Sequence, residues 1–186
     1  MKNPETDASK AISSKSGSSS FENLFAEHWT RIYRLLCCLV GDPAEAEDLA
    51  LEAFFRLHQH YPQSDGTFNT GGWLYRVATN LGLHSIRDFK RREHYELTAG
   101  RYALDETKQD DPPEALAQEE ERQLARSVLA SMDERQSQLL IMRHSGMAYK
   151  DIAKALGLSP ASIGPLLLRA EREFEKRYRA LTQEEV

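Results

Sequence analysis

Residues 149–163 read YKDIAKALGLSPASI, and this stretch decides the fold of the C-terminal part of the chain. Ala153 is small enough for two helices to approach closely, and Gly157 suits the tight turn between them. The apolar residues that would fill the shared core are Ile152, Leu156, Leu158, Ile163 and Leu166. The spacing predicts a helix-turn-helix whose second helix reads DNA, although a helical hairpin in any bundle can show the same pattern.

The second helix of this hairpin carries signals of its own. Ser159 can cap it through the hydroxyl, and Pro160 at the first helical position loses no hydrogen bond that a helix would have made. Pro165 lies beyond the first turn, where it removes a hydrogen bond and can kink the helix, and Gly164 loosens it further. We therefore expect base reading to fall on the first turn of this helix, around Ala161 and Ser162.

Composition limits the class of protein. The 186 residues are 40% hydrophobic, which is enough for one medium domain or two small ones with real cores. The N-terminus is polar and Ser-rich, and no run approaches the roughly 18 apolar residues of a membrane span, so we expect a cytoplasmic protein without membrane insertion. A net charge of −5 argues against indiscriminate DNA coating, so nucleic-acid contact requires a local basic patch or a larger partner.

The sequence gives no sign of catalytic chemistry. Cys37 and Cys38 are adjacent inside an apolar helical pattern, which favours small core residues over a redox pair. His58 and His60 are two residues apart on a predicted helix and point to different faces, so they cannot form a good metal pair. Glycine-rich phosphate loops, nucleophile elbows and zinc spacings are missing from the sequence. We expect a non-enzymatic protein without metal or cofactor.

Capping and helix-breaking residues divide the N-terminal half into three predicted helices. Residues 1–20 are rich in Ser and Lys and are predicted to form a disordered tail. Apolar residues at helical spacing begin at Phe21, and Gly41 can end that helix in a left-handed conformation. Asp42 is a good N-cap for a second helix that runs to about His60, with Glu45 placed for a capping box. A flexible loop over 63–72 then precedes a third helix that starts near Trp73.

The composition becomes acidic and proline-rich over residues 96–121, which we interpret as a flexible linker between domains. A second apolar block starts near Leu124, and Asp133 with Gln136 forms another capping box before the hairpin. Strand-like alternation does not appear at any length. The expected fold is all-α, with one small helical domain over 21–95, a second over 122–180 that contains the helix-turn-helix, and a tail over 181–186.

The second helix carries two apolar faces. One stripe can face the first helix, and it consists of Ala46, Leu49, Ala53 and Leu57. Leu51 and Phe55 lie on another side, and the carboxylates that rim them are Glu47, Asp48 and Glu52. This arrangement favours a docking face for a basic partner, unless a further helix of the same domain covers Leu51 and Phe55.

Aromatic and basic residues share the third helix, a combination that suits single-stranded DNA. The cations that can pair with phosphates are Arg76, Arg87, Lys90, Arg91 and Arg92. Trp73 at the helix start can stack on an unpaired base, and Asn80 can bond a base edge. Trp73 is also spaced like a core residue, so both roles stay open for it.

The order and spacing of several motifs resemble one family. The motifs are residues 32–34 (IYR), 41–42 (GD), 46–49 (AEDL) with Glu52 and Phe54, 73–78 (WLYRVA) with Asn80 and Leu81, and the hairpin. Together they resemble the extracytoplasmic-function (ECF) group of bacterial RNA polymerase sigma factors, over about residues 21–178. The resemblance implies a region 2 over 21–95, a region 4 over the C-terminal domain, and an acidic linker lying along channels of the polymerase.

The resemblance also assigns roles to residues. The face formed by Glu47, Asp48, Leu51, Glu52 and Phe55 would dock on the clamp helices of the largest polymerase subunit. Residues 63–92 would open and hold the promoter's minus-ten element through Trp73, Arg76, Asn80, Arg87, Lys90, Arg91 and Arg92. The helix after the turn would read the minus-thirty-five element through Ser159, Ala161, Ser162, Arg169 and Arg172. Two departures stand out, because the family usually has Gln in place of Leu51 and a Lys-Ser-Arg-like run in place of residues 164–166.

The implied function is a sigma factor that binds core RNA polymerase and directs promoter recognition, DNA melting and transcription initiation. An anti-sigma protein is a further partner that the resemblance implies. One alternative is a stand-alone DNA-binding regulator that uses only the C-terminal hairpin. Another is a sigma-like decoy that binds polymerase or an anti-sigma protein without productive initiation.

Overall fold

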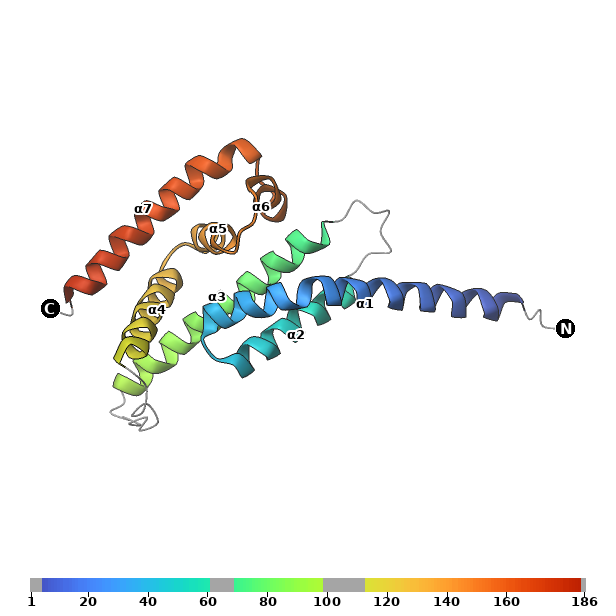
Figure 1. Ribbon diagram of the computed structural model, residues 1–186, viewed down its shortest axis with the longest axis horizontal. Coiled ribbons are helices and arrows are strands. Elements are labelled where there is room, and N and C mark those ends of the chain that lie inside the picture. The colour runs from blue at the N-terminus through green and yellow to red at the C-terminus, as the bar shows by residue number, and fades with distance from the viewer. Residues whose placement is uncertain (1–4, 61–68, 99–112, 185–186) are drawn as a thin grey trace.

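The computed structural model describes residues 5–60, 69–98 and 113–184, and every regular element in these ranges is a helix (Figure 1). The seven helices are α1 (Glu5–Val40), α2 (Pro43–His60), α3 (Thr70–Thr98), α4 (Pro113–Ser131), α5 (Glu134–His144), α6 (Tyr149–Leu156) and α7 (Pro160–Glu184). The all-α prediction is therefore confirmed. None of the described helices is long and apolar enough to cross a membrane.

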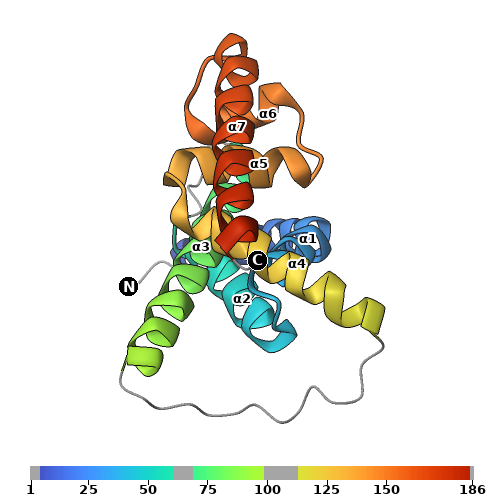
Figure 2. The same ribbon diagram turned by 90° about the vertical axis from the view of Figure 1, so that its left-hand side faces the viewer.

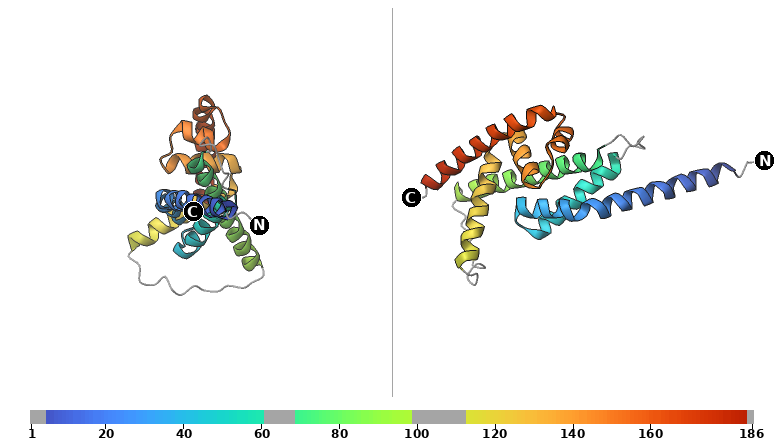
Figure 3. Two further views of the ribbon diagram at one scale, coloured as in Figure 1. Left: turned by 90° about the vertical axis from the view of Figure 1, so that its right-hand side faces the viewer. Right: turned by 45° about the horizontal axis from the view of Figure 1, so that its top comes forward.

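Helix α1 differs from the sequence prediction at its start. It begins at Glu5, so residues 5–20, expected as a disordered tail, continue the helix that was expected from Phe21. Proline is absent from residues 5–20, so helical hydrogen bonding can propagate toward the N-terminus from the packed part of the helix. The N-terminal half of α1 projects away from the other helices (Figures 1 and 3).

Helices α1, α2 and α3 pack around one core, which contains Leu36, Leu57 and Leu74. Gly41 between α1 and α2 has a φ of +84°, the left-handed conformation that the sequence predicts. The Asp42 carboxylate caps α2, accepting from the N–H groups of Ala44 at 2.7 Å and Glu45 at 3.1 Å. The Glu45 side chain accepts from the Ser85 hydroxyl of α3 instead of closing a capping box, because α3 brings a donor within reach.

Helices α4 to α7 form the second bundle. Asp133 caps α5 through its carboxylate, which accepts from the N–H groups of Arg135 at 3.0 Å and Gln136 at 3.3 Å. Gly157 makes the turn between α6 and α7 with a φ of +65°. At the start of α7 the backbone carbonyl of Ser159, not its hydroxyl, accepts from the N–H of Ser162, at 2.9 Å. Helix α7 continues through Pro165 to Glu184.

Helix α3 joins the two bundles. It packs against α1 and α2 on one side and against α4, α5 and α6 on the other, so that α5, α6 and α7 lie above the first three helices in Figure 2. Helix α4 begins at Pro113, within the predicted linker of residues 96–121; a proline followed by acidic residues favours a helix start. Residues 99–112 of the predicted linker lie outside the described residues, as does most of the 63–72 loop.

Candidate nucleic-acid and protein interfaces

The predicted docking face lies on the outer side of α2. Leu51 is 47% exposed and Phe55, one turn later, is 55% exposed, while Ala53 and Leu57 on the opposite side are buried. The alternative that another helix covers this pair therefore does not hold in the described part of the chain. The result is an apolar pair on the surface, of the kind that marks an interaction site.

The carboxylates around this pair differ in their contacts. Glu47 and Asp48 are exposed, whereas Glu52 is half-buried and accepts from Nε of Arg56 at 2.7 Å. Glu52 and Arg56 are four residues apart on α2, a spacing at which an ion pair forms within the helix. Glu47 and Asp48 are therefore the two carboxylates of the face that are most accessible to a cationic partner.

Trp73, near the start of α3, combines features of the two roles that the sequence left open, a core residue and a surface for base stacking. Trp73 is half-buried and packs against the core, and its ring centroid lies 6.4 Å from that of His60. Asn69 fixes the start of this helix, because its side-chain oxygen accepts from the N–H of Gly72 at 3.1 Å. Arg76, one turn into the helix, is exposed. The indole therefore contributes to the core with one part and reaches the surface with another.

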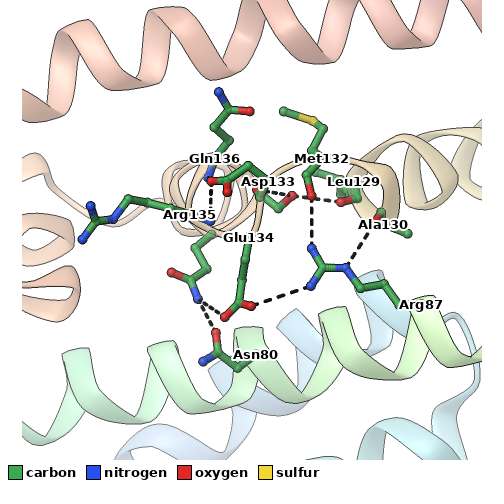
Figure 4. A network of polar contacts seen from close by, with 11 residues as sticks. Asn80, Arg87, Leu129, Ala130, Met132, Asp133, Glu134, Arg135 and Gln136 are labelled. Atoms are coloured by element: carbon green, nitrogen blue, oxygen red, sulfur yellow. Dashed lines mark hydrogen bonds and ion pairs between the residues drawn. The ribbon is translucent and has the colours of Figure 1, made fainter.

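Three of the predicted minus-ten residues contact the second bundle, and two of them, Asn80 and Arg87, are seen in Figure 4. Arg87 donates from Nε to the carbonyl of Ala130 and from Nη2 to the carbonyl of Met132, each at 3.1 Å. Its Nη1 lies 3.8 Å from the carboxylate of Glu134. Two further contacts run beside these. Lys90 donates from Nζ to the carbonyl of Ser127 at 3.3 Å, and the Gln138 amide donates to the Asn80 side-chain oxygen.

We name the acceptors and partners on this side the α4–α5 corner, which comprises the carbonyls of Ser127, Ala130 and Met132 and the side chains of Glu134 and Gln138. The other predicted cations of α3 point elsewhere. Arg91 and Arg92 are exposed, and Arg91 pairs with Asp88 of its own helix. The seven predicted minus-ten residues are thus split into three that contact the corner, three exposed arginines and the half-buried Trp73.

The predicted minus-thirty-five residues lie at the surface of α7. Ala161, Arg169 and Arg172 are exposed, as is Ser159 before the helix, and Ser162 is half-buried. The side of α7 opposite the buried Ile163 and Leu167 carries an apolar set that sequence reasoning did not single out as a whole. We name this set the outward face of α7, and it consists of Ala161, Pro165 and Leu168. The helical spacing of these three residues was the signal that could have found it.

Two arginines were missed by sequence reasoning: Arg126 bridges the two bundles, and Arg177 joins α7 to the end of α4 within the second bundle. Arg126 of α4 is only 12% exposed, bonds Glu119 at 2.7 Å, and donates from Nε to the carbonyl of Cys38 at the end of α1 at 3.3 Å. Arg177 of α7 donates to the carbonyl of Ser131 at 2.6 Å. Cations favour helix C-termini, where carbonyls lack partners, but which terminus a distant arginine reaches depends on tertiary packing.

Two carboxyls have lowered pKa values. Burial of Glu119 acts to raise its pKa, but hydrogen bonds and charges from Arg126 and Arg122 outweigh burial, so the pKa lies below its usual value. The hydrogen bond from Arg177 lowers the pKa of Glu173. Both carboxylates are therefore charged at neutral pH and hold arginines that bond helix ends.

The described residues offer little that resembles a metal or small-molecule site. Within residues 5–60, 69–98 and 113–184 we find no group of three or more His, Cys, Asp or Glu side chains that could hold a metal ion. A cavity of about 170 Å³ lies between the α1–α2 turn, α3 and α4, and Phe89, Lys90 and Arg126 are among its lining residues. Cys38 is exposed and Cys37 half-buried, so the expectation that both are core residues is wrong for Cys38.

Two family models match the chain. The model of sigma-70 region 2 matches residues 24–93, and that of sigma-70 region 4 matches residues 122–174. The ECF RNA polymerase sigma factor SigE of Mycolicibacterium smegmatis is 30% identical over 163 residues, which cover 83% of this chain and 60% of SigE. The RNA polymerase sigma factor YlaC of Bacillus subtilis is 25% identical over 167 residues, which cover 89% of this chain and 96% of YlaC.

The fold also resembles a solved structure. The structure of CnrH in complex with the cytosolic domain of CnrY superposes with a TM-score of 0.57 at 17% identity, covering 91% of this chain and 96% of that chain. At this identity the likeness concerns the fold alone.

Proposed function

The chain belongs to the ECF group of the sigma-70 family of RNA polymerase sigma factors, and from this membership we propose that it binds core RNA polymerase and directs it to promoters. Binding energy alone would carry this function, without a catalytic step. The observation that supports it most is the exposed apolar pair on α2 with its acidic rim, because a regulator acting on DNA alone has no use for such a face.

The α2 face would supply the polymerase contact. Exposed Leu51 and Phe55 offer apolar area for the centre of an interface, and Glu47 and Asp48 offer charges for its rim. The partner we propose is the clamp helices of the largest polymerase subunit. Because Leu51 replaces the glutamine usual in the family, apolar burial contributes more to this interface than a side-chain hydrogen bond would.

Helix α3 would bind the minus-ten element as a single strand. Arg76, Arg91 and Arg92 are exposed and can pair with phosphates, and the exposed part of Trp73 can stack on an unpaired base. A protein that binds single-stranded DNA better than duplex shifts the duplex toward the melted form. Domain 21–95 would thus combine polymerase binding with strand capture.

Helix α7 would enter the major groove at the minus-thirty-five element. Ser159, Ala161 and Ser162 stand at its N-terminal end, where a recognition helix meets base edges, and Arg169 and Arg172 can reach phosphates. Domain 122–180 would therefore hold duplex DNA while domain 21–95 holds the strand. We propose a cytoplasmic location, where polymerase and DNA are found, and an anti-sigma protein as a further partner.

Run-off transcription tests this function. Core RNA polymerase is incubated with a genomic promoter pool, with and without the protein, and the RNA ends are sequenced. New starts that share upstream elements are expected. Core binding without new starts would instead identify a decoy, and DNA binding without core binding would identify a stand-alone regulator.

A matched pair of variants tests the docking face. Leu51→Lys places a charge in the centre of the face and should lower core binding by about a hundredfold, since truncated or charged hot-spot residues cost several kcal/mol. Gln59→Lys adds the same charge at an exposed position near the end of α2 and should leave core binding unchanged. Equal binding by both variants would exclude this face as the polymerase contact.

A further inference from the structure

The outward face of α7 lies on the side of the helix that is turned away from the core. Ala161, Pro165 and Leu168 are spaced four and three residues apart, so they form one stripe along the helix. All three residues are exposed, and Leu168 is 48% exposed. Their side chains carry no hydrogen-bond donor or acceptor. The helix that we propose for duplex DNA therefore presents an apolar stripe to it.

Tyr149, at the start of α6, widens this stripe. It is 44% exposed, and a Cβ placed on Gly164 of α7 would lie 3.9 Å from the Cε2 atom of Tyr149. That distance is an ordinary van der Waals contact, so the packing leaves room for a side chain at residue 164. Glycine and proline within a helix are both destabilising, yet Gly164 and Pro165 stand side by side here. Such departures from local helix preference are expected at functional sites.

Cations border the apolar surface. The guanidinium carbon of Arg143 lies 5.2 Å from the ring centroid of Tyr149, over the ring. Arg169 and Arg172 follow Leu168 on α7, and both are exposed. An apolar centre with cations around it matches a DNA major groove, which has phosphates along its borders and base edges between them.

The four bases differ in what they offer to a side chain that has no donor or acceptor. In the major groove guanine presents acceptors, cytosine a donor, and adenine one of each, whereas thymine presents an acceptor and a methyl group. An apolar side chain set against a donor or an acceptor deprives that group of its water partner, which costs free energy. Contact with the thymine methyl group instead buries apolar area on both molecules. The outward face of α7 therefore favours thymine.

We propose that the outward face of α7, together with Tyr149, reads thymine methyl groups, so that the minus-thirty-five element of this protein consists largely of A·T pairs. The inference rests on the proposed function, in which α7 holds duplex DNA. Pro165 and Leu168 become specificity-determining residues, in place of the basic run that is usual in the family. Arg169 and Arg172 hold phosphates and add no base preference of their own.

Selection from a random library tests whether A·T pairs are preferred. The full-length protein is mixed with a duplex library that has a random central segment, and the bound DNA is separated by gel mobility shift and sequenced. Residues 161–168 span roughly 10 Å along the helix axis, so we expect about three adjacent A·T pairs with thymines on a fixed strand. Enrichment of G·C pairs, or no enrichment, would overturn the proposal.

Uracil isolates the contribution of the methyl group, because it pairs with adenine as thymine does and lacks only the C5-methyl. The selected duplex is synthesised with thymine or with deoxyuridine at the enriched positions, and fluorescence anisotropy gives the affinity of the free protein for each. Every contacted thymine should contribute up to about fourfold in affinity, the factor that corresponds to burial of one methyl group. Equal affinities would overturn the proposal and would attribute the A·T preference to DNA shape.

Leu168→Ser tests whether this residue detects the methyl group. Serine removes most of the apolar area, so the variant should bind the thymine and uracil duplexes with nearly equal affinity. Ala180→Ser is the matched control, because it places the same side chain at an exposed position near the other end of α7, and it should keep the wild-type ratio. Both positions are exposed, so neither variant should impair folding. A wild-type ratio in Leu168→Ser would overturn the proposal.

The two kinds of measurement separate this inference from the proposed function. The ratio of thymine to uracil affinity is measured without polymerase, whereas run-off transcription requires core polymerase. New transcription starts without a methyl effect would overturn the inference alone. A methyl effect without binding to core polymerase would overturn the proposed function and leave a stand-alone protein that reads thymine-rich DNA.

Discussion

The two faces proposed to bind DNA, on α3 and on α7, differ in whether other residues of the chain cover them. On α3, Arg87, Lys90 and Asn80 are bonded to carbonyls and side chains of the second bundle. On α7, the outward face of Ala161, Pro165 and Leu168 is exposed, and Leu168 alone is 48% exposed. One face is polar and covered, whereas the other is apolar and open to solvent.

This difference shows which kind of DNA-binding face a chain can cover with its own residues. Charged and amide groups can be satisfied by the chain's own carbonyls, so they can be covered and uncovered at a small net free energy. An apolar set on a recognition helix has no donors to satisfy and remains exposed at modest cost, because single surface apolar residues are normal in folded proteins. Contacts within the chain can therefore cover the α3 face, whereas the outward face of α7 stays exposed.

The largest effect we predict separates the outward face of α7 from the core directly behind it. Leu167 is 2% exposed, so Leu167→Ala should lower the free energy of unfolding by about 2–4 kcal/mol through the lost burial and the cavity left behind. Leu168→Ala removes the same atoms from the exposed neighbour and should cost less than about 1 kcal/mol. Urea unfolding measures both values; similar losses would mean that Leu168 is also a core residue.

Pro165→Ala is expected to stabilise the protein. The substitution restores a backbone N–H inside α7 and removes the clash of the proline ring, so the free energy of unfolding should rise by about 1–2 kcal/mol. Thermal unfolding measures the change, with Pro160→Ala as the control, since a proline at the first helical position loses no hydrogen bond. A lower melting temperature for Pro165→Ala would show that the surrounding packing requires the proline.

Arg87→Ala and Arg92→Ala compare a covered cation of α3 with an exposed one. In the holoenzyme both should weaken minus-ten strand binding, by roughly tenfold for Arg87 and less for the more exposed Arg92. In the free protein, spin labels at Gln59→Cys on α2 and Ala180→Cys on α7 should also give a broader distance distribution for the Arg87 variant, because this variant lacks two hydrogen bonds to the α4–α5 corner. The Arg92 variant should leave that distribution unchanged. A broader distribution would mean that Arg92 also contacts the second bundle.

A cation added to the outward face of α7 should make the affinity for duplex DNA depend more steeply on salt concentration. Leu168→Arg is expected to raise the affinity for random duplex DNA a few-fold and to steepen the dependence of log affinity on log salt by about one unit. Gln183→Arg adds a cation near the end of the same helix, where we expect little change in slope. Equal slopes for Leu168→Arg and the wild type would mean that this face lies away from phosphates.

The smallest effect concerns pH. The pKa of Glu119 is lowered in the folded protein, so its ion pair with Arg126 contributes stability above the usual carboxyl pKa and loses it as the pH falls through the lowered value. Between pH 5 and pH 3 the wild type should therefore lose on the order of 1–2 °C more in melting temperature than Glu119→Gln. Parallel melting curves over this pH range would show that the pair contributes nothing.

Local signals in the sequence predicted the helices and several of their ends, but not the starts of α1 and α4 or the contact between the bundles. Asp42, Asp133 and Gly157 each act within a few residues of their own position, so periodicity and capping rules place them correctly. The contact of Arg87 with the end of α4 joins residues more than forty positions apart. A basic residue predicts a negative partner without saying which, and the sequence therefore favoured DNA alone.

The same limit explains the exposed faces. Spacing predicted that Leu51 and Phe55 lie away from α1, but whether another helix covers them depends on the arrangement of all the helices. For Gly164 and Pro165, the resemblance to the family implied which basic contacts are missing, whereas the outward face became evident only once the buried side of α7 was known. Propensity fixes what a residue can do, and packing decides what it contacts.

Pro165 has a consequence that no side chain carries. Because proline has no N–H, the carbonyl of Ala161, one turn earlier on the outward face, lacks its usual helical donor. In a major groove this peptide oxygen could accept from the exocyclic amino group of adenine or cytosine. Such readout would persist when every other side chain of the face is cut back to alanine, and it would disappear only when residue 165 regains its amide proton. An alanine scan that spares Pro165 would then describe this helix as indifferent to sequence while its backbone still discriminates between bases.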